Sequence, residues 1–406
     1  MKKTRGDAPA KPKLWTKDYI VLCAVNVLFS YGFSMMMPLL ALYIVACGGD
    51  SKDVGITSAG FTMAAILMRF VSPLILDKMN RKLLLALCTA ISAGISLGYT
   101  FTDTVAGILL YRILMGFAFG IVSALCTTLA ADILPDLRRG EGIGYFGMGN
   151  TLMSALSPVA ALYLAEHTGY PAAFVTACVG QLLCTVAVGF FRPPREVIAP
   201  RPQKHAKAPP FVSRVFDKAL LLHMILLVLF GLYRSSELNF LPLLAVEKGI
   251  KNFPVFYFCQ TGVSFLTRMV IGSLYDRKGA AYVMIPGGVM ALIGIYLFSI
   301  SNSLDVLLLA GAFNGMMLGA VQPGLQAWAI DCVAPERRSI ASAAYFSYYD
   351  IGLGIGAFIM GYMARGNGYS LIYTLALIPA ALFLAVFLIG FFGLKMGRPR
   401  GAHSFR

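Results

Sequence analysis

Long apolar stretches alternate with short polar ones along the whole chain. Each apolar stretch has 20 or more residues, enough for an α-helix to cross a hydrocarbon core of roughly 30 Å. Because backbone amides in lipid must be hydrogen-bonded within their own segment, these stretches predict helices and exclude open strands. Twelve helices are predicted, over residues 19–46, 54–76, 82–101, 105–134, 143–165, 171–192, 219–246, 254–276, 281–300, 305–333, 341–363 and 369–394.

The polar segments between the predicted helices reveal an internal repeat. "RFVSPLILDKMNRK" occupies residues 69–82, and a similar motif, "RMVIGSLYDRKG", occupies residues 268–279, which places the copies 199 residues apart. At the same separation, "RILMGFAFG" at 112–120 aligns with "GAFNGMMLG" at 311–319. Six helices in each half is an even number, so both halves enter the membrane in the same direction. This is a parallel repeat, whose halves share one interface near the bilayer midplane.

The repeat predicts how the chain is divided. We expect an N-terminal tail at 1–18, a six-helix bundle over 19–192, a linker at 193–218, a second six-helix bundle over 219–394 and a C-terminal tail at 395–406. The linker is rich in Pro, Lys and Arg and cannot bury enough apolar surface to fold alone. The predicted fold class is therefore an all-α membrane protein with twelve transmembrane helices in two pseudo-symmetric six-helix bundles.

The distribution of charge predicts the orientation in the membrane. Charged residues make up only 13% of the chain, against about a quarter in soluble domains. Of 34 Lys and Arg residues, 26 lie in tails and loops on the side of the N-terminus and 4 in loops on the opposite side. This excess places both termini in the cytoplasm and the protein in the cell (inner or plasma) membrane. The net charge of +15 then reflects topology and contact with membrane lipids, and nucleic acid is not expected as a partner.

The two charged motifs resemble a signature of a known family. They are similar to the loop sequence G-x-x-x-D-(R/K)-x-G-R-(R/K) of the major facilitator superfamily, although Pro73 and Asn80 replace its glycines in the first copy. "LLYRILMGFAFG" at 109–120 resembles the fourth-helix motif of the twelve-helix drug:proton antiporter (efflux) branch, with Arg112 at the functional arginine. The fifth-helix motif of that branch survives only in part, within residues 144–161.

This resemblance implies a secondary active transporter that works by alternating access. The expected function is proton-coupled efflux of amphipathic or drug-like small molecules. The alternative is a proton-coupled carrier of a polar metabolite, such as a sugar, a zwitterionic metal chelator or a lipid head group. A monomer is expected, with a small-molecule substrate and protons as partners. The sequence contains no metal-ligand pair, nucleophile elbow or nucleotide loop, so neither an enzyme nor a cofactor or metal is expected.

Ionisable residues inside the apolar stretches are the candidates for proton coupling. A charged side chain at the middle of a membrane helix costs roughly 2.5–3.5 kcal/mol on insertion scales, so each one needs a reason. Asp350 lies near the middle of the eleventh helix, Glu237 follows Arg234 by three residues in the seventh, and Arg112 lies in the fourth. Structural alternatives are a hydrogen bond from Asp350 to a neighbouring tyrosine and a local ion pair between Arg234 and Glu237.

Other polar residues within the helices are candidates to line a substrate cavity. Each of them is also explained by a hydrogen bond between helices. Asn150 is the counterpart of Asp350 in the repeat, and Gln322 and Gln326 share a helix face one turn apart. The candidate cavity residues are Asn26, Tyr31, Asn150, Arg234, Gln260, Asn314, Gln322 and Gln326.

Charged residues near the loop motifs are candidates for a cytoplasmic gate. Family resemblance implies that Asp77 faces the start of the eleventh helix near Arg338, and pseudo-symmetry then places Asp276 near Arg138. The alternative is that these charges only set topology. The candidate gate residues are Arg69, Asp77, Lys78, Arg81, Arg138, Arg139, Arg268, Asp276, Arg277, Arg337 and Arg338.

Overall fold

The computed structural model describes residues 13–76, 78–135, 138–199, 220–333 and 338–393. These residues contain twelve long α-helices and no β-strand. The helices of the first half are α1 (Lys17–Ala46), α2 (Ser51–Leu76), α3 (Arg81–Gly98), α4 (Val105–Ile133), α5 (Arg139–His167) and α6 (Tyr170–Phe190). Those of the second half are α9 (Leu221–Glu247), α10 (Val255–Lys278), α11 (Ala281–Ser299), α12 (Leu304–Asp331), α13 (Arg338–Ala364) and α14 (Ser370–Leu388). Short elements are η1 (Tyr99–Phe101), α7 (Arg195–Ile198) and the π-helical turn η5 (Ile389–Gly393).

Each of the twelve predicted helices is present, with ends within a few residues of those expected, so the predicted fold class is confirmed. Polar side chains explain where several of the helices begin. Asn80 accepts hydrogen bonds from the backbone amides of Lys82 (3.0 Å) and Leu83 (3.2 Å) and so caps α3. The residue that replaces the second glycine of the family signature therefore acts as a helix N-cap.

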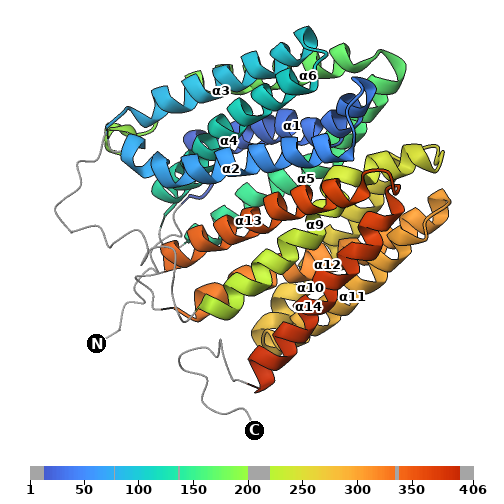
Figure 1. The fold of residues 1–406 in the computed structure, drawn as a ribbon. Coiled ribbons are helices and arrows are strands. Elements are labelled where there is room, and N and C mark those ends of the chain that lie inside the picture. The colour runs from blue at the N-terminus through green and yellow to red at the C-terminus, as the bar shows by residue number, and fades with distance from the viewer. Residues whose placement is uncertain (1–12, 77, 136–137, 200–219, 334–337, 394–406) are drawn as a thin grey trace, which may run out of the picture.

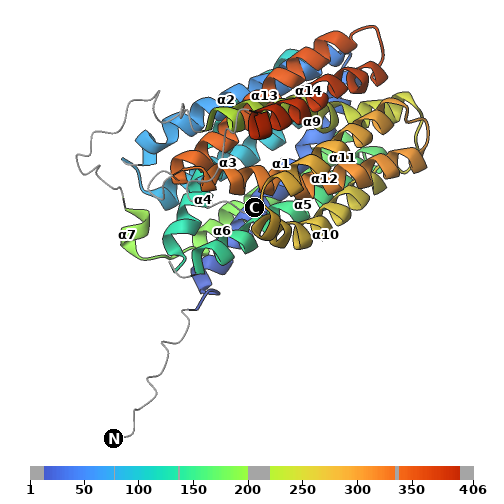
Figure 2. The same cartoon turned by 90° about the horizontal axis from the view of Figure 1, so that it is seen from below.

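The helices form two bundles that pack side by side. Figure 1 shows α1–α6, coloured blue to green, above α9–α14, coloured yellow to red. We call the end at which α1 and α9 begin the tail side, and the end at which they stop the far side. Figure 2 shows α2 and α13 lying next to each other along their length, as they do in Figure 1. The boundaries of the predicted linker and tails remain predictions, because residues 200–219 and both chain ends lie outside the described residues.

Glycines at repeated positions bring pairs of helices together in the same way in both bundles. A Cβ added to Gly116 on α4 would lie 2.4 Å from the backbone oxygen of Phe61 on α2. A Cβ added to Gly315 on α12 would lie 2.4 Å from the backbone oxygen of Gln260 on α10. Only glycine permits backbones this close. Gly315 lies 199 residues after Gly116, and Gln260 lies 199 residues after Phe61. The sequence repeat is therefore also a structural repeat.

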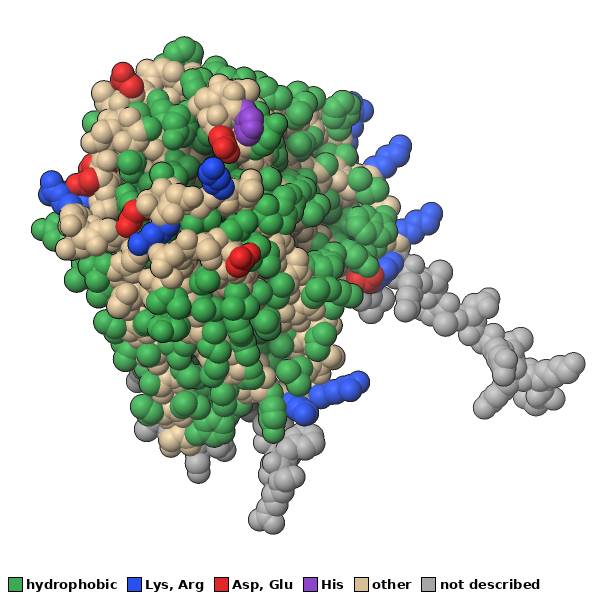
Figure 3. Space-filling view, turned by 90° about the vertical axis from the view of Figure 1, so that its right-hand side faces the viewer, with side chains coloured by type: hydrophobic (Ala, Val, Ile, Leu, Met, Phe, Trp, Pro, Cys, Tyr) green, Lys and Arg blue, Asp and Glu red, His purple; other side chains and the backbone are tan. Residues whose placement is uncertain are grey.

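Hydrophobic side chains cover much of the outer surface. The exposed fractions are 74% for Met63, 81% for Phe101 and 67% for Phe190. Figure 3 shows acidic side chains in the upper part of the view and a broad area of hydrophobic side chains below them. Among the described residues, eight helices are long and apolar enough to cross a membrane. A surface of this kind suits lipid and would associate in water.

Candidate functional site

An ion pair joins the two bundles. Arg69 on α2 donates from Nη1 to Oδ2 of Asp350 on α13, and the exposed fractions of the two side chains are 16% and 17%. The guanidinium also lies 5.8 Å from the ring centre of Phe346, one turn before Asp350. The sequence assigned Arg69 to the gate and Asp350 to proton coupling, and the structure brings the two residues together.

The equivalent contact in the other half of the repeat carries no acidic partner. Arg268 on α10, the counterpart of Arg69, donates to Thr151 Oγ1 on α5 at 3.2 Å. It also donates to Gln322 Oε1 on α12 at 3.3 Å. An arginine therefore crosses the interface at both repeated positions, but among the described residues only Arg69 meets a carboxylate there.

Asn150, the counterpart of Asp350, bonds within its own bundle. Its Oδ1 accepts hydrogen bonds from Asn26 Nδ2 (2.8 Å) and from Ser30 Oγ (2.6 Å), both on α1. Asn26 also donates to the backbone oxygen of Phe146 at 3.1 Å. Two predicted cavity residues thus bond α1 to α5. The two halves of the repeat therefore differ at this position, where the first carries an amide and the second a carboxylate.

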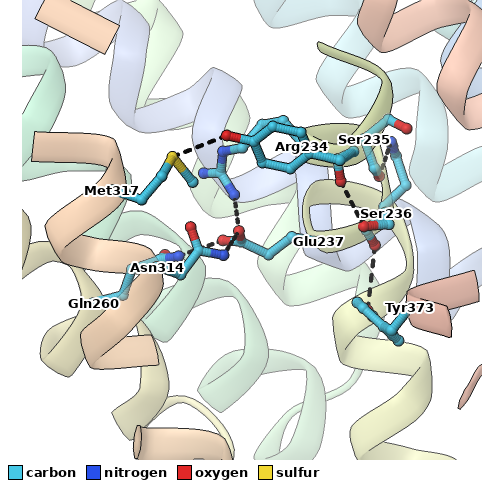
Figure 4. A network of polar contacts seen from close by, with 10 residues as sticks. Arg234, Ser235, Ser236, Glu237, Gln260, Asn314, Met317 and Tyr373 are labelled. Atoms are coloured by element: carbon cyan, nitrogen blue, oxygen red, sulfur yellow. Dashed lines mark hydrogen bonds and ion pairs between the residues drawn. The ribbon is translucent and has the colours of Figure 1, made fainter. Parts of the chain in front are cut away.

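A second acidic residue is buried within the second bundle. Glu237 on α9 accepts from Arg234 on the same helix, from Gln260 on α10 and from Asn314 on α12. Figure 4 shows these side chains pointing at the carboxylate from three helices. Glu237 is 5% exposed. The local ion pair considered from the sequence is present, and it forms part of a network in which three donors satisfy one buried charge.

Arg112 on α4 has a different environment. It is 2% exposed, its Nη2 lies 3.2 Å from the sulfur of Met37 and its guanidinium lies 4.3 Å from the ring centre of Phe61. Its Nη1 has no hydrogen-bond partner among the described residues. A small cavity between the bundles is lined by Met37, Ser58, Phe61, Thr62, Arg112, Leu238, Asn239 and Leu353.

None of the eight residues predicted to line a substrate cavity is among the residues that line this one. Tyr31 packs against Gly180 on α6, inside the first bundle. Gln322 accepts from Arg268, and Gln326 lies half-buried one turn further along α12. Ser58, Thr62 and Asn239 line the cavity and were not predicted from the sequence. Small polar side chains are common in membrane helices, so their spacing alone carries no signal.

Several of the gate candidates lie at the tail side, and the contacts expected between them stay predictions. Arg81 pairs with Asp132 at 2.9 Å, which joins the start of α3 to the end of α4. Arg138 pairs with Glu141 at 2.9 Å, whereas Asp276 is exposed. Lys78 and Arg277 are exposed too. Asp77 and Arg337 lie outside the described residues, as do the side chains of Arg139 and Arg338.

One protein-family model matches almost the whole chain. The family model described as the Major Facilitator Superfamily matches residues 22–279 and 252–404. The chain belongs to the major facilitator superfamily. It is accordingly a multi-pass membrane transporter of small molecules.

Proteins that match this chain over most of its length include one named as an export protein. An uncharacterised MFS-type transporter of Methanocaldococcus jannaschii is 22% identical over 373 residues, covering 89% of this chain and 95% of that protein. The staphylopine export protein of Staphylococcus aureus is 21% identical over 366 residues, covering 88% and 90%. A solved structure of a POT family transporter in complex with a thioalcohol-conjugated peptide has a TM-score of 0.76 at 15% identity, covering 94% of this chain and 96% of that one. The last similarity shows the major facilitator fold.

Proposed function

We propose that the chain is a proton-coupled exporter of amphipathic or drug-like small molecules. It works by alternating access in the cell membrane, with both termini in the cytoplasm. The observation that carries the proposal is the ion pair between Arg69 and Asp350, because it places a titratable carboxylate in the contact between the two bundles.

The position of this pair suits control of the tail side. Arg69 lies seven residues before the tail-side end of α2, and Asp350 lies twelve residues after α13 begins. At 1.5 Å per residue, the pair is on the order of 10–18 Å inside that end. The far side is closed by other contacts: Ser51 Oγ donates to the backbone oxygen of Gly361 at 2.9 Å, and Arg365 pairs with Asp50 at 2.8 Å. Breaking the Arg69–Asp350 pair therefore loosens the tail side and leaves the far side in place.

Protonation supplies the energy for this change. A protonated Asp350 no longer carries the charge that attracts Arg69. Removing one partner of a fully buried ion pair costs roughly 3–5 kcal/mol, and a partly exposed pair is worth less. A difference of about 1.4 kcal/mol already changes a conformational equilibrium tenfold. The proton gradient can thus bias the two bundles between tail-side-closed and tail-side-open states.

The direction of transport rests on two further observations. The fourth-helix motif around Arg112 is similar to that of the efflux branch, and a relative that matches over most of both chains is named an export protein. The apolar walls of the cavity, Met37, Phe61, Leu238 and Leu353, suit an amphipathic molecule.

Transport in reconstituted vesicles tests the proposal. Proteoliposomes under an imposed pH gradient are supplied with a cationic dye, ethidium, or an anionic dye, fluorescein. The wild-type protein should drive at least one dye against its gradient, and Asp350→Asn should abolish gradient-driven flux. Asp331→Asn, the same change at an exposed position at the end of α12, should leave the flux intact. Undiminished gradient-driven flux in Asp350→Asn would remove Asp350 from the coupling mechanism.

A further inference from the structure

The guanidinium of Arg112, which has no acidic partner among the described residues, indicates what the cavity binds. We infer that the transported molecule is an amphipathic organic anion whose carboxylate binds Arg112 in the cavity between the bundles. This inference rests on the proposed transport function and adds the class of substrate.

The contacts of Arg112 leave its charge without a counter-ion. Met37 offers a thioether and Phe61 an aromatic face, and Tyr99 is the titratable side chain that lies against the guanidinium. All three are uncharged, and Nη1 has no partner among the described residues. A cation–π contact is worth at most about 2 kcal/mol, whereas burial of an isolated charge costs considerably more. A carboxylate that fits the open side of the guanidinium would form a charge-assisted hydrogen bond there.

Other deeply placed arginines of this chain do have acidic partners. Arg69 pairs with Asp350, Arg81 with Asp132 and Arg234 with Glu237. Arg268 bonds to two neutral oxygens and is only half-buried. Arg112 differs because it combines near-complete burial and an adjoining cavity with the lack of an acidic partner among the described residues.

The cavity lies between the two sets of contacts that close the protein. Along α2, Ser51 bonds to α13 at the far side, residues 58–62 line the cavity, and Arg69 forms the ion pair. Along α13 the order is reversed: Asp350 forms the ion pair, Leu353 lines the cavity, and residue 361 accepts from Ser51. A molecule in this cavity would be enclosed on both sides, as alternating access requires of a transported substrate.

The side chains that line the cavity indicate the chemical character of the substrate outside its carboxylate. Four apolar side chains, Met37, Phe61, Leu238 and Leu353, surround the cavity, and three small polar ones lie among them. Ser58 and Asn239 already bond to each other at 2.6 Å. In this closed conformation the space beside Arg112 holds about one water molecule, so the body of the substrate enters when the two bundles move apart. A compact apolar body with one acidic group matches this lining better than a polyhydroxylated molecule.

Ligand binding to the purified full-length protein tests the inference without transport. We expect benzoate to raise the thermal unfolding midpoint. Benzamide, which has the same shape and no charge, should not raise it, and neither should gluconate, a carboxylate with a polyhydroxylated body. Benzamide as effective as benzoate would overturn the role of charge. Gluconate as effective as benzoate would overturn the amphipathic class and favour a polar metabolite.

A variant separates binding from a structural role. Arg112→Gln should weaken benzoate binding roughly tenfold or more, as expected for a lost charge-assisted hydrogen bond. Its unfolding midpoint without ligand should equal or exceed that of the wild-type protein, because an unpaired buried charge is removed. Arg192→Gln, the same change at an exposed site, should keep both properties. A lower midpoint with unchanged benzoate affinity would show that Arg112 is structural and contradict the inference.

Transport then distinguishes failure of the inference from failure of the proposed function. Flux of fluorescein that depends on Arg112 supports both. Flux of ethidium alone, unaffected by Arg112→Gln, would preserve the exporter and overturn the organic anion. Flux of neither dye under a pH gradient, together with benzoate binding that depends on Arg112, would preserve the anion site and overturn the exporter.

Discussion

At the scale of single residues, the chain uses intramembrane charges in three ways. Glu237 is surrounded by three donors within one bundle, Asp350 meets its cation across the interface, and Arg112 has no acidic partner among the described residues. A carboxylate whose donors all come from one bundle keeps them when the bundles move. We therefore propose that the first arrangement contributes to stability, the second to conformational change and the third to binding.

Replacement of Glu237 tests the first of these roles. Glu237→Gln replaces an acceptor-only group by an amide that presents hydrogens to a site full of donors, and it leaves Arg234 unpaired. We expect the protein to lose roughly 3–5 kcal/mol of stability, as for other broken buried ion pairs. Thermal unfolding measures this, with Glu166→Gln, at an exposed position, as the control. Equal midpoints for both variants would mean that the network adds nothing to stability.

At the scale of helices, much of the architecture follows from the length of apolar stretches. Twelve helices and the repeat of six could be predicted because lipid forces each long apolar segment to satisfy its own hydrogen bonds. The pairing of Arg69 with Asp350 could not, since it depends on how two separate bundles dock and rotate. The same limit applies to Gln260 and Asn314. Both were predicted to line a cavity, and in the structure both donate hydrogen bonds to Glu237. Sequence patterns within one helix cannot show which side chains of other helices will meet.

The close packing of α2 against α4 predicts how replacement of a glycine at their contact changes stability. Gly116→Ala should destabilise the protein by about 1–3 kcal/mol, because its Cβ would collide with backbone that cannot move freely. Gly94→Ala on α3, where nothing lies within 4 Å, should be neutral or stabilising by up to about 1 kcal/mol. Thermal unfolding of the two variants provides the comparison. Similar midpoints for both would contradict the close approach of α2 and α4.

At the scale of the whole molecule, the two bundles are alike in fold and unlike in chemistry. The repeat places an arginine at the interface twice, through Arg69 and Arg268, but a carboxylate opposes only the first. We therefore propose that a proton acts on one of the two contacts. The structure combines closure at the far side, a cavity between the bundles and one ion pair toward the tail side, which we propose responds to protons. These are the parts that a proton-driven exporter needs, and their coupling is the central claim.

A distance between the bundles measures that coupling most directly. Leu83 and Tyr282 occupy equivalent, exposed positions near the tail-side starts of α3 and α11. Spin labels are attached at these two positions in a variant whose native cysteines have been replaced. Double electron–electron resonance then measures the distance between the labels, and so the tail-side separation of the bundles. The account predicts that acid pH lengthens this distance in the wild-type protein, and that Asp350→Asn shows the longer distance at every pH. A distance that does not respond to pH in the wild-type protein, or that responds equally in Asp350→Asn, would contradict it.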